Sequence, residues 1–346
     1  MNKLSGLLLA LFLLLPAPAA AEGLSVAVSI PPQEYFARAI CGERLEALTV
    51  MVPPGAEPHA YEPSPRQVGS LSEADVYFAV GAPFERAWLE RFGSISPAMR
   101  VVHTDSGIDK IPMGESGHEG HGHEAHGHEE HGHGEHGHGE HGHGEHGHGE
   151  HGHGEHGHAE HGNDAHAHES HGHGEPGREA HGHGAYDPHV WLAPEPVRVI
   201  ADNMLAALVE ADPAGAEAYR AGHARLLEEV ARTDREVRNI LADVPRGAAF
   251  LVYHPAFAYF ARAYGLREVA IQQAGKEPSP RRLAELTEMA REKGVEAIFV
   301  EPQFSTREAS IIADRIGAEV VEADPLAADW PDNLKRLARA FRSAAK

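Results

Sequence analysis

Residues 212–245, DPAGAEAYRAGHARLLEEVARTDREVRNILADVP, predict one long helix. Asp212 and Pro213 form an N-cap and first-turn pair, and Pro245 marks the far end. About 30 residues at a rise of ~1.5 Å each give a rod of roughly 45 Å. Opposite charges four residues apart are typical of a partly solvated helix, so we expect a rigid connector rather than an ordinary helix within one lobe. Its apolar face comprises Leu226, Val230, Val237, Ile240 and Leu241.

Short apolar runs alternate with helix-length segments on both sides of this helix. Before it, the predicted strands are 25–30, 48–52, 76–80 and 101–103, with a helix over 33–40. After it, the predicted strands are 249–253, 268–271, 297–300 and 319–321, with helices over 280–293, 307–316 and 333–341. Such alternation indicates parallel sheets. We therefore predict an α/β fold with two (β/α) lobes, 22–212 and 245–346, joined by a linking helix at 213–244.

An insertion interrupts the first lobe at 113–185. Its composition is Gly, His and Glu, and a five-residue unit, Glu-His-Gly-His-Gly, repeats from Glu130 to Gly154. All but five of the 29 histidines lie in it. Because it has almost no aliphatic residues to bury, we expect a disordered loop rather than a stacked repeat.

The N-terminus has the pattern of a secretory signal peptide. Lys3 precedes an apolar stretch from Leu7 to Leu15, and Ala19-x-Ala21 predicts cleavage before Glu22, so the signal covers residues 1–21. No later apolar run of ~18 residues exists to anchor the chain in a membrane. The expected location is the periplasm.

Charge and cysteine content exclude several classes of function. A formal net charge of −22 argues against a nucleic-acid partner, which requires clustered Lys and Arg. Cys41 is the only cysteine, so neither a disulfide nor a cysteine-based zinc or redox site can form within the chain. Cys41 itself is interpreted as a small buried apolar residue. Metal binding must use His, Asp and Glu.

The five histidines outside the insertion differ in their surroundings. His254 directly follows a predicted strand, and His59 lies in a proline-rich turn after another, at the strand ends where open α/β sheets bind ligands. His189 lies where ordered sequence resumes after the insertion. In contrast, His103 ends a strand without turn residues, and His223 is in the middle of a helix. The candidate ligands are therefore His59, His189 and His254.

Three carboxylates compete for a further role at this site. Asp324 follows the predicted strand 319–321 and would complete a tetrahedral set of three nitrogens and one oxygen, which zinc accepts. Glu57 is close to His59 in sequence, whereas Glu301 opens a turn at a strand end and could orient an imidazole. The fourth ligand is left open between Asp324, Glu57 and water.

Five segments together resemble the metal-binding segments of the cluster A-I solute-binding proteins of ABC transporters. The closest likeness is to the zinc-uptake, ZnuA-type branch, which also carries a His-rich acidic insertion, and it extends in order over the mature chain. The segments are PPGAEPHAYE (53–62), DPHVWL (187–192), HPAFAYF (254–260), EPQF (301–304) and DPL (324–326).

The resemblance implies two lobes joined by a rigid helix, with Zn(II) held between them as transported cargo and passed to an inner-membrane ABC permease. It assigns His59 and His189 from the first lobe, His254 from the second, and Asp324 at the family's carboxylate position. Manganese-binding relatives have a carboxylate at the position of His254, and imidazole favours zinc. Some zinc-branch members have a disulfide in the second lobe, which this chain cannot form. A monomer is expected.

Two other functions compete with this one. Three histidines with an open position also describe a catalytic zinc site, but the sequence has neither HExxH nor a GxSxG elbow, so an enzyme is not favoured. Alternatively, the insertion is a periplasmic metal buffer carried by the lobes, since dense histidine binds several ions weakly. If the protein instead serves zinc transport, the insertion acts as an antenna or sensor that collects metal for the site between the lobes. A solute-binding protein for manganese or another divalent metal is a further alternative.

Overall fold

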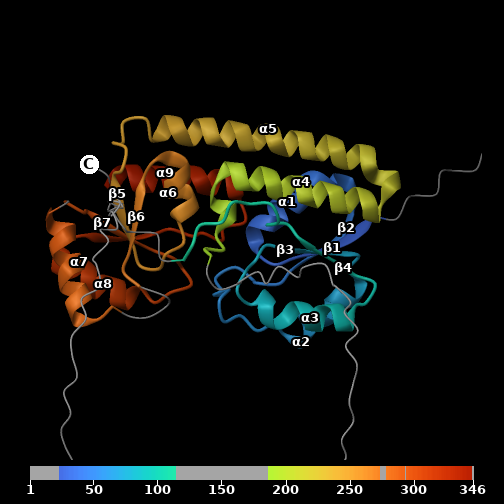
Figure 1. Cartoon of the computed structure of the whole chain (residues 1–346), viewed down its shortest axis with the longest axis horizontal. Helices are drawn as coiled ribbons and strands as arrows, with labels where there is room; N and C mark the ends of the chain where they lie inside the picture. Colours follow the sequence, from blue (N-terminus) through green and yellow to red (C-terminus); the bar gives the residue numbers. More distant parts are fainter. Residues whose placement is uncertain (1–22, 114–185, 273–277, 293, 345–346) are drawn as a thin grey trace, which may run out of the picture. The chain divides into compact units, whose positions relative to one another are not determined.

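The computed structural model describes residues 23–113, 186–272, 278–292 and 294–344. The predicted signal peptide at 1–21 and nearly all of the insertion lie outside these residues. The described chain contains two four-stranded parallel sheets, which confirms the predicted α/β class with two lobes (Figure 1). Both sheets have the same topology, with strand order β2-β1-β3-β4 in the first and β6-β5-β7-β8 in the second.

The first sheet consists of β1 (Leu24–Val28), β2 (Leu45–Val50), β3 (Val76–Ala79) and β4 (Arg100–His103). The helices between and after these strands are α1 (Pro31–Cys41), α2 (Pro65–Ser70), α3 (Glu85–Ile95) and α4 (Pro194–Ala211). β1 and β3 are buried along most of their length, as expected for the middle of a parallel sheet covered by helices.

The second sheet consists of β5 (Ala249–Val252), β6 (Arg267–Ala270), β7 (Ala297–Val300) and β8 (Glu319–Glu322). Its helices are α6 (Ala258–Tyr264), α7 (Pro280–Glu292), α8 (Thr306–Ile316) and α9 (Trp330–Ala344). Because β5 lies between β6 and β7, the order of strands reverses between β5 and β7. Ligands of open α/β sheets bind at the carboxyl ends of strands beside such a reversal, and His254 follows β5 there.

The linking helix α5 (Ala216–Ile240) is 25 residues long, roughly 38 Å. It begins three residues later than predicted because Pro213–Gly215 form a separate 3₁₀ turn. Asp212 holds this start: its carboxylate accepts hydrogen bonds from Gly215 N (3.2 Å), Tyr219 Oη (2.7 Å) and Arg44 Nε (2.8 Å). The buried face of α5 packs against α1 and α4 from the first lobe and α9 from the second, so the helix connects the two (Figure 1).

The apolar core of the first lobe continues into α9. The ring of Trp330 lies 5.6 Å from that of Phe36 in α1, and its indole nitrogen donates to the main-chain oxygen of Trp191 at 2.6 Å. Cys41 is buried in this core, as predicted, and burial raises the pKa of its thiol to about 12. Among the described residues, none of the helices combines the length and apolar composition needed to cross a membrane.

The two ends of the insertion are joined by backbone pairing. Pro112 and Tyr186 form an antiparallel bridge, and Asp187 N donates to Ile111 O at 2.8 Å. Tyr259 of α6 reinforces the junction, because its hydroxyl accepts from Ile111 N and donates to Asp187 O, both at 3.0 Å. These contacts fix the point at which the chain re-enters the first lobe, shortly before His189.

Candidate metal centre

The structure brings His59, His189 and His254 together. One ring nitrogen from each lies within 4.8 Å of the others. Among the described residues, no other group of three or more His, Cys, Asp or Glu side chains has its ligand atoms this close together. Ring centroids are 4.9 Å apart for His59 and His254, and 6.1 Å apart for the other two pairs. The predicted ligands thus come from the loop after β2, the segment before α4 and the end of β5. Their role as ligands stays a prediction.

A protein oxygen binds the Nδ1 atom of each of the three rings. His59 Nδ1 donates to Glu57 Oε1, His189 Nδ1 to Asp187 Oδ1 at 2.7 Å, and His254 Nδ1 to Gln272 Oε1 at 3.3 Å. Because a carboxylate or amide oxygen only accepts, Nδ1 carries the proton and the lone pair is left on Nε2. This arrangement fixes the tautomer of a metal-binding imidazole and orients its ring.

Local sequence explains two of these contacts. Glu57-Pro58-His59 and Asp187-Pro188-His189 share one pattern, in which the acid accepts from the main-chain nitrogen of the histidine two residues later as well as from its ring. Those main-chain bonds are 2.7 Å for His59 and 2.8 Å for His189. The repeated acid-proline-histidine triplet is the signal from which sequence reasoning could have found the role of Asp187. Gln272, which follows β6, carries no such signal.

Burial keeps the third imidazole neutral. His254 is 7% exposed, and burial, together with the nearby His189 and His59, lowers its pKa to about 3. Its Nε2 atom is buried without a hydrogen-bond partner among the described residues. An unpartnered buried acceptor of this kind is costly unless something binds it. A cation at the centre of the three rings would satisfy it.

The pKa values of Glu57 and Glu301 are shifted in opposite directions. Burial alone would raise the pKa of Glu57, but hydrogen bonds from His59 and Ala60 outweigh it and lower the pKa. Glu301 is 1% exposed, and burial raises its pKa well above the usual range. Glu301 was predicted to orient an imidazole. At His254 the oxygen that contacts Nδ1 belongs to Gln272.

Asp324 lies outside the group of three histidines. Its Oδ1 atom accepts from Leu326 N at 2.9 Å and from Gln303 Nε2 at 3.1 Å. The other histidines are also elsewhere: His223 contacts Asp202 with Nε2 at 2.7 Å from Oδ1, and His103 is exposed at the end of β4. The structure thus joins three of the four predicted ligands and leaves the fourth position open.

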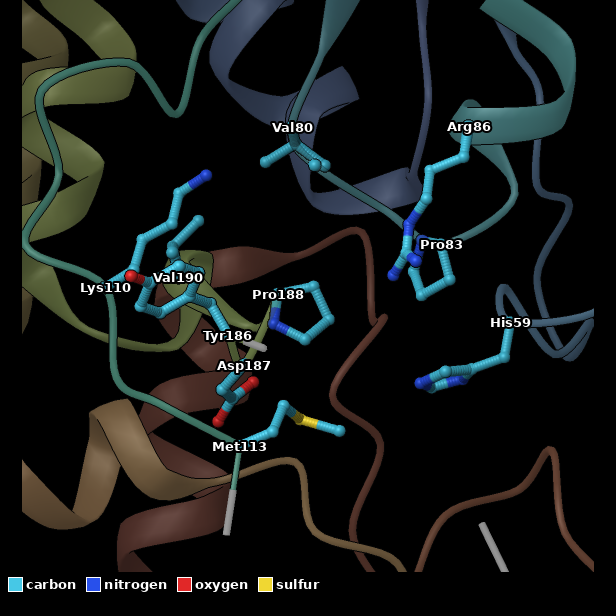
Figure 2. Close-up of a pocket in the computed structure, with 11 residues that line it drawn as sticks. His59, Val80, Pro83, Arg86, Lys110, Met113, Tyr186, Asp187, Pro188 and Val190 are labelled. Carbon is cyan, nitrogen blue, oxygen red and sulfur yellow. The ribbon is translucent and has the colours of Figure 1, made fainter. Parts of the chain in front are cut away.

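A pocket of about 130 Å³ opens beside His59. His59, Asp187, Arg86 and Lys110 are among its lining residues, and Figure 2 shows the His59 imidazole and the Arg86 guanidinium directed into it. Lys110 pairs with Asp105, so its charge is balanced. Met113 and Tyr186, beside the two ends of the insertion, also line the pocket. The pocket therefore extends from His59 to the residues at which the described chain stops before the insertion and resumes after it.

Two parallel-sheet lobes, a long connecting helix and three imidazole nitrogens converging from both lobes define a metal-binding solute-binding protein. Comparison with known proteins gives the family. The family described as zinc-uptake complex component A, periplasmic (ZnuA), matches residues 26–344, and the chain belongs to it.

Individual relatives agree with this assignment. The crystal structure of ZnuA is 31% identical, with a TM-score of 0.71 over 94% of this chain and 100% of its own. The zinc-binding protein AdcA of Streptococcus pyogenes serotype M3 is 24% identical over 309 residues, which is 88% of this chain and 51% of AdcA. This chain therefore spans about half the length of AdcA. The manganese-binding lipoprotein MntA of Halalkalibacterium halodurans is 23% identical over 302 residues, 86% of this chain and 78% of MntA.

Proposed function

We propose that this protein captures Zn(II) in the periplasm and delivers it to an inner-membrane ABC permease. The observation that carries the proposal is the convergence of three imidazoles whose Nδ1 atoms are all hydrogen-bonded to protein oxygens. That leaves Nε2 of His59, His189 and His254 for one ion. The fourth position stays among Asp324, Glu57 and water. Membership of the zinc-uptake family supports the same function.

Zinc is preferred over manganese in this proposal because imidazole suits zinc, whereas manganese favours oxygen ligands. The relatives include a protein named for each metal, so the choice rests on the ligands of this chain. The direct test is a titration with zinc and with manganese of a protein lacking residues 116–184, beside its His59→Ala, His189→Ala and His254→Ala variants. We expect one tight zinc site that each substitution weakens. Tighter binding of manganese would overturn the metal assignment.

The insertion is proposed to collect metal for this site. Its ends are held together at Pro112 and Tyr186, so removing residues 116–184 should leave the fold intact. The full-length and shortened proteins are then compared for metal capacity and for zinc uptake in cells. If the protein is instead a metal buffer, the deletion removes nearly all capacity. Equal uptake at limiting zinc with and without the insertion would contradict the collecting role.

The remaining proposals concern processing and organisation. The mature protein begins at Glu22, is a monomer and consists of the lobes 22–212 and 245–346 around the linking helix. The mass of the protein recovered from the periplasm checks the cleavage site. Its sedimentation checks the monomer.

A further inference from the structure

Three hydrogen bonds from described residues hold Asp324. Its main-chain oxygen accepts from Asn333 Nδ2 at 2.7 Å, which fixes the backbone. Its carboxylate uses one oxygen, Oδ1, for both Leu326 N and Gln303 Nε2. Leu326 is two residues away and moves with the same turn. Among the described residues, Gln303, from the segment after β7, is therefore the side chain whose hydrogen bond ties this carboxylate to a different part of the lobe.

Gln303 belongs to a short turn that also contacts a candidate ligand. Phe304 N donates to Glu301 O at 3.0 Å, which closes the turn. The Phe304 ring stacks on the imidazole of His254, with centroids 4.7 Å apart and planes at 27°. Adjacent residues of one turn thus support His254 in the metal centre and hold Asp324 outside it.

We propose that Gln303 is a specificity-determining residue that holds Asp324 away from the bound metal. This inference rests on the proposed function of the three-histidine site, and it narrows the fourth position, left open above, to water, so that Asp324 is not a ligand. With Asp324 restrained, the ion receives three imidazoles and water, a set that suits zinc. Manganese, which prefers carboxylate oxygen, lacks a ligand it needs. Loss of the Gln303 hydrogen bond frees the carboxylate to turn toward the ion.

The decisive variant is Gln303→Met, which keeps the length of the side chain and removes the donor. Affinities for zinc and manganese are measured with the full-length protein in a chelator buffer strong enough to keep weaker histidine sites empty. Because a hydrogen bond to a charged group is worth about tenfold or more in an equilibrium constant, we expect manganese to bind about tenfold tighter in the variant. Zinc should change less.

Asp324→Asn and the double variant complete the cycle. If Gln303 acts through Asp324, the gain in manganese affinity disappears in the double variant, and Asp324→Asn alone changes neither affinity. Cobalt in place of zinc gives a second readout, since its visible spectrum reports the ligand set. Asp324→Asn should leave the wild-type spectrum unchanged, whereas Gln303→Met should alter it and the double variant should restore it.

Phe304→Leu controls for a loosened turn. If Gln303→Met acted by disturbing His254, Phe304→Leu would reproduce its effects, and zinc binding would weaken in both. That result overturns the proposal, as does a wild-type spectrum that changes with Asp324→Asn alone, or an unchanged ratio of affinities in Gln303→Met. Failure of the proposed function is distinguishable, because wild-type protein would then lack a tight zinc site that depends on His254.

Discussion

Glu57 and Asp187 each accept two hydrogen bonds from the histidine two residues further along the chain, one from its main chain and one from its ring. The first bond fixes the turn, and the second sets the tautomer. At His254 the corresponding oxygen comes from Gln272, eighteen residues away. Orientation of each ring is therefore built in before any ion binds, which lowers the cost of organising the site.

The variant Asp187→Asn tests the contribution of this contact to metal binding by His189. The variant retains an oxygen that can accept from His189 but loses the negative charge that makes the imidazole a stronger ligand. Since such substitutions cost about ten- to a hundredfold in metal affinity, zinc should bind weaker by at least about tenfold. Competition with a fluorescent chelator measures the zinc affinity of the variant and of the wild type.

Asp202→Asn is the matched control for this prediction. Asp202 also contacts a histidine, His223, but this pair is not part of the three-histidine group, and Asp202 is exposed. Its substitution should leave zinc affinity unchanged. Equal losses in the two variants would show that the effect is one of net charge.

Glu268 offers a prediction about stability rather than metal. Its Oε1 atom accepts from Ala256 N (3.0 Å) and Phe257 N (2.8 Å), and Oε2 is buried without a partner among the described residues. Burial raises its pKa from 4.5 to about 8. Between pH 4.5 and about 8, Glu268 is protonated in the folded chain and ionised in the unfolded chain. The contribution of this residue to the free energy of unfolding is therefore most favourable below about pH 4.5 and falls as the pH rises to about 8.

Glu268→Gln removes that dependence while keeping an oxygen for the two main-chain donors. At pH 8 the variant should therefore unfold at a higher urea concentration than wild type, and the difference should shrink as the pH falls toward 4.5. Glu319→Gln, at an exposed position on β8, serves as the comparison. A constant difference across this range would contradict the assignment of a buried protonated acid.

At the scale of elements, the close crossing of α5 and α1 depends on Gly222. A Cβ atom there would lie 2.7 Å from the main-chain oxygen of Ala39 and closer still to that of Ile40. These oxygens belong to the last turn of α1 and cannot move without moving the helix. Glycine inside a helix normally costs stability relative to alanine, but the contact reverses the expectation at this position.

Gly222→Ala should therefore destabilise the protein by about 1–3 kcal/mol, measured as the free energy of unfolding in urea. Gly93→Ala in α3 is the control, because a Cβ atom at Gly93 meets nothing within 4 Å. That substitution should stabilise by up to about 1 kcal/mol. If both variants are stabilised, α5 does not pack against α1 as closely as described.

Helices and strands were predictable where the local pattern of apolar and turn-forming residues determines them. The strands lie within a few residues of their predicted positions, because short apolar runs between turns are a local property. The start of α9 was predicted at Asn333, but the helix begins at Trp330, since Pro331 fits the first turn of a helix and does not end one. That His59 and His254 lie near each other was inferable from strand ends, whereas His189 was added because ordered sequence resumes there after the insertion. The contacts of Gln272 and of Gln303 with distant residues depend on tertiary packing and left no trace in the local sequence.

At the scale of the whole molecule, one ion would bind residues from both lobes. Because the folded chain alone brings His59, His189 and His254 together, zinc should stabilise it against unfolding. A free zinc concentration about a thousand times the dissociation constant adds about 4 kcal/mol. Calorimetric scans with zinc and with a chelator should show this as a higher Tm with zinc.

His254→Ala should abolish most of that increase, and His223→Ala should preserve it. Both variants retain the whole insertion, so its histidines cannot account for a difference between them. A Tm increase that survives His254→Ala would place the stabilising ion elsewhere.

The bridge between Pro112 and Tyr186 has a consequence for how this gene can change. A tandem array of five-residue units can be lengthened or shortened by whole units. Each such event alters only the length between two points that the fold already holds together, and the entropy of closing a loop grows slowly with its length. The number of histidines can thus change with little penalty to the folded lobes, so the metal-collecting capacity proposed for the insertion can vary independently of the site that it would serve.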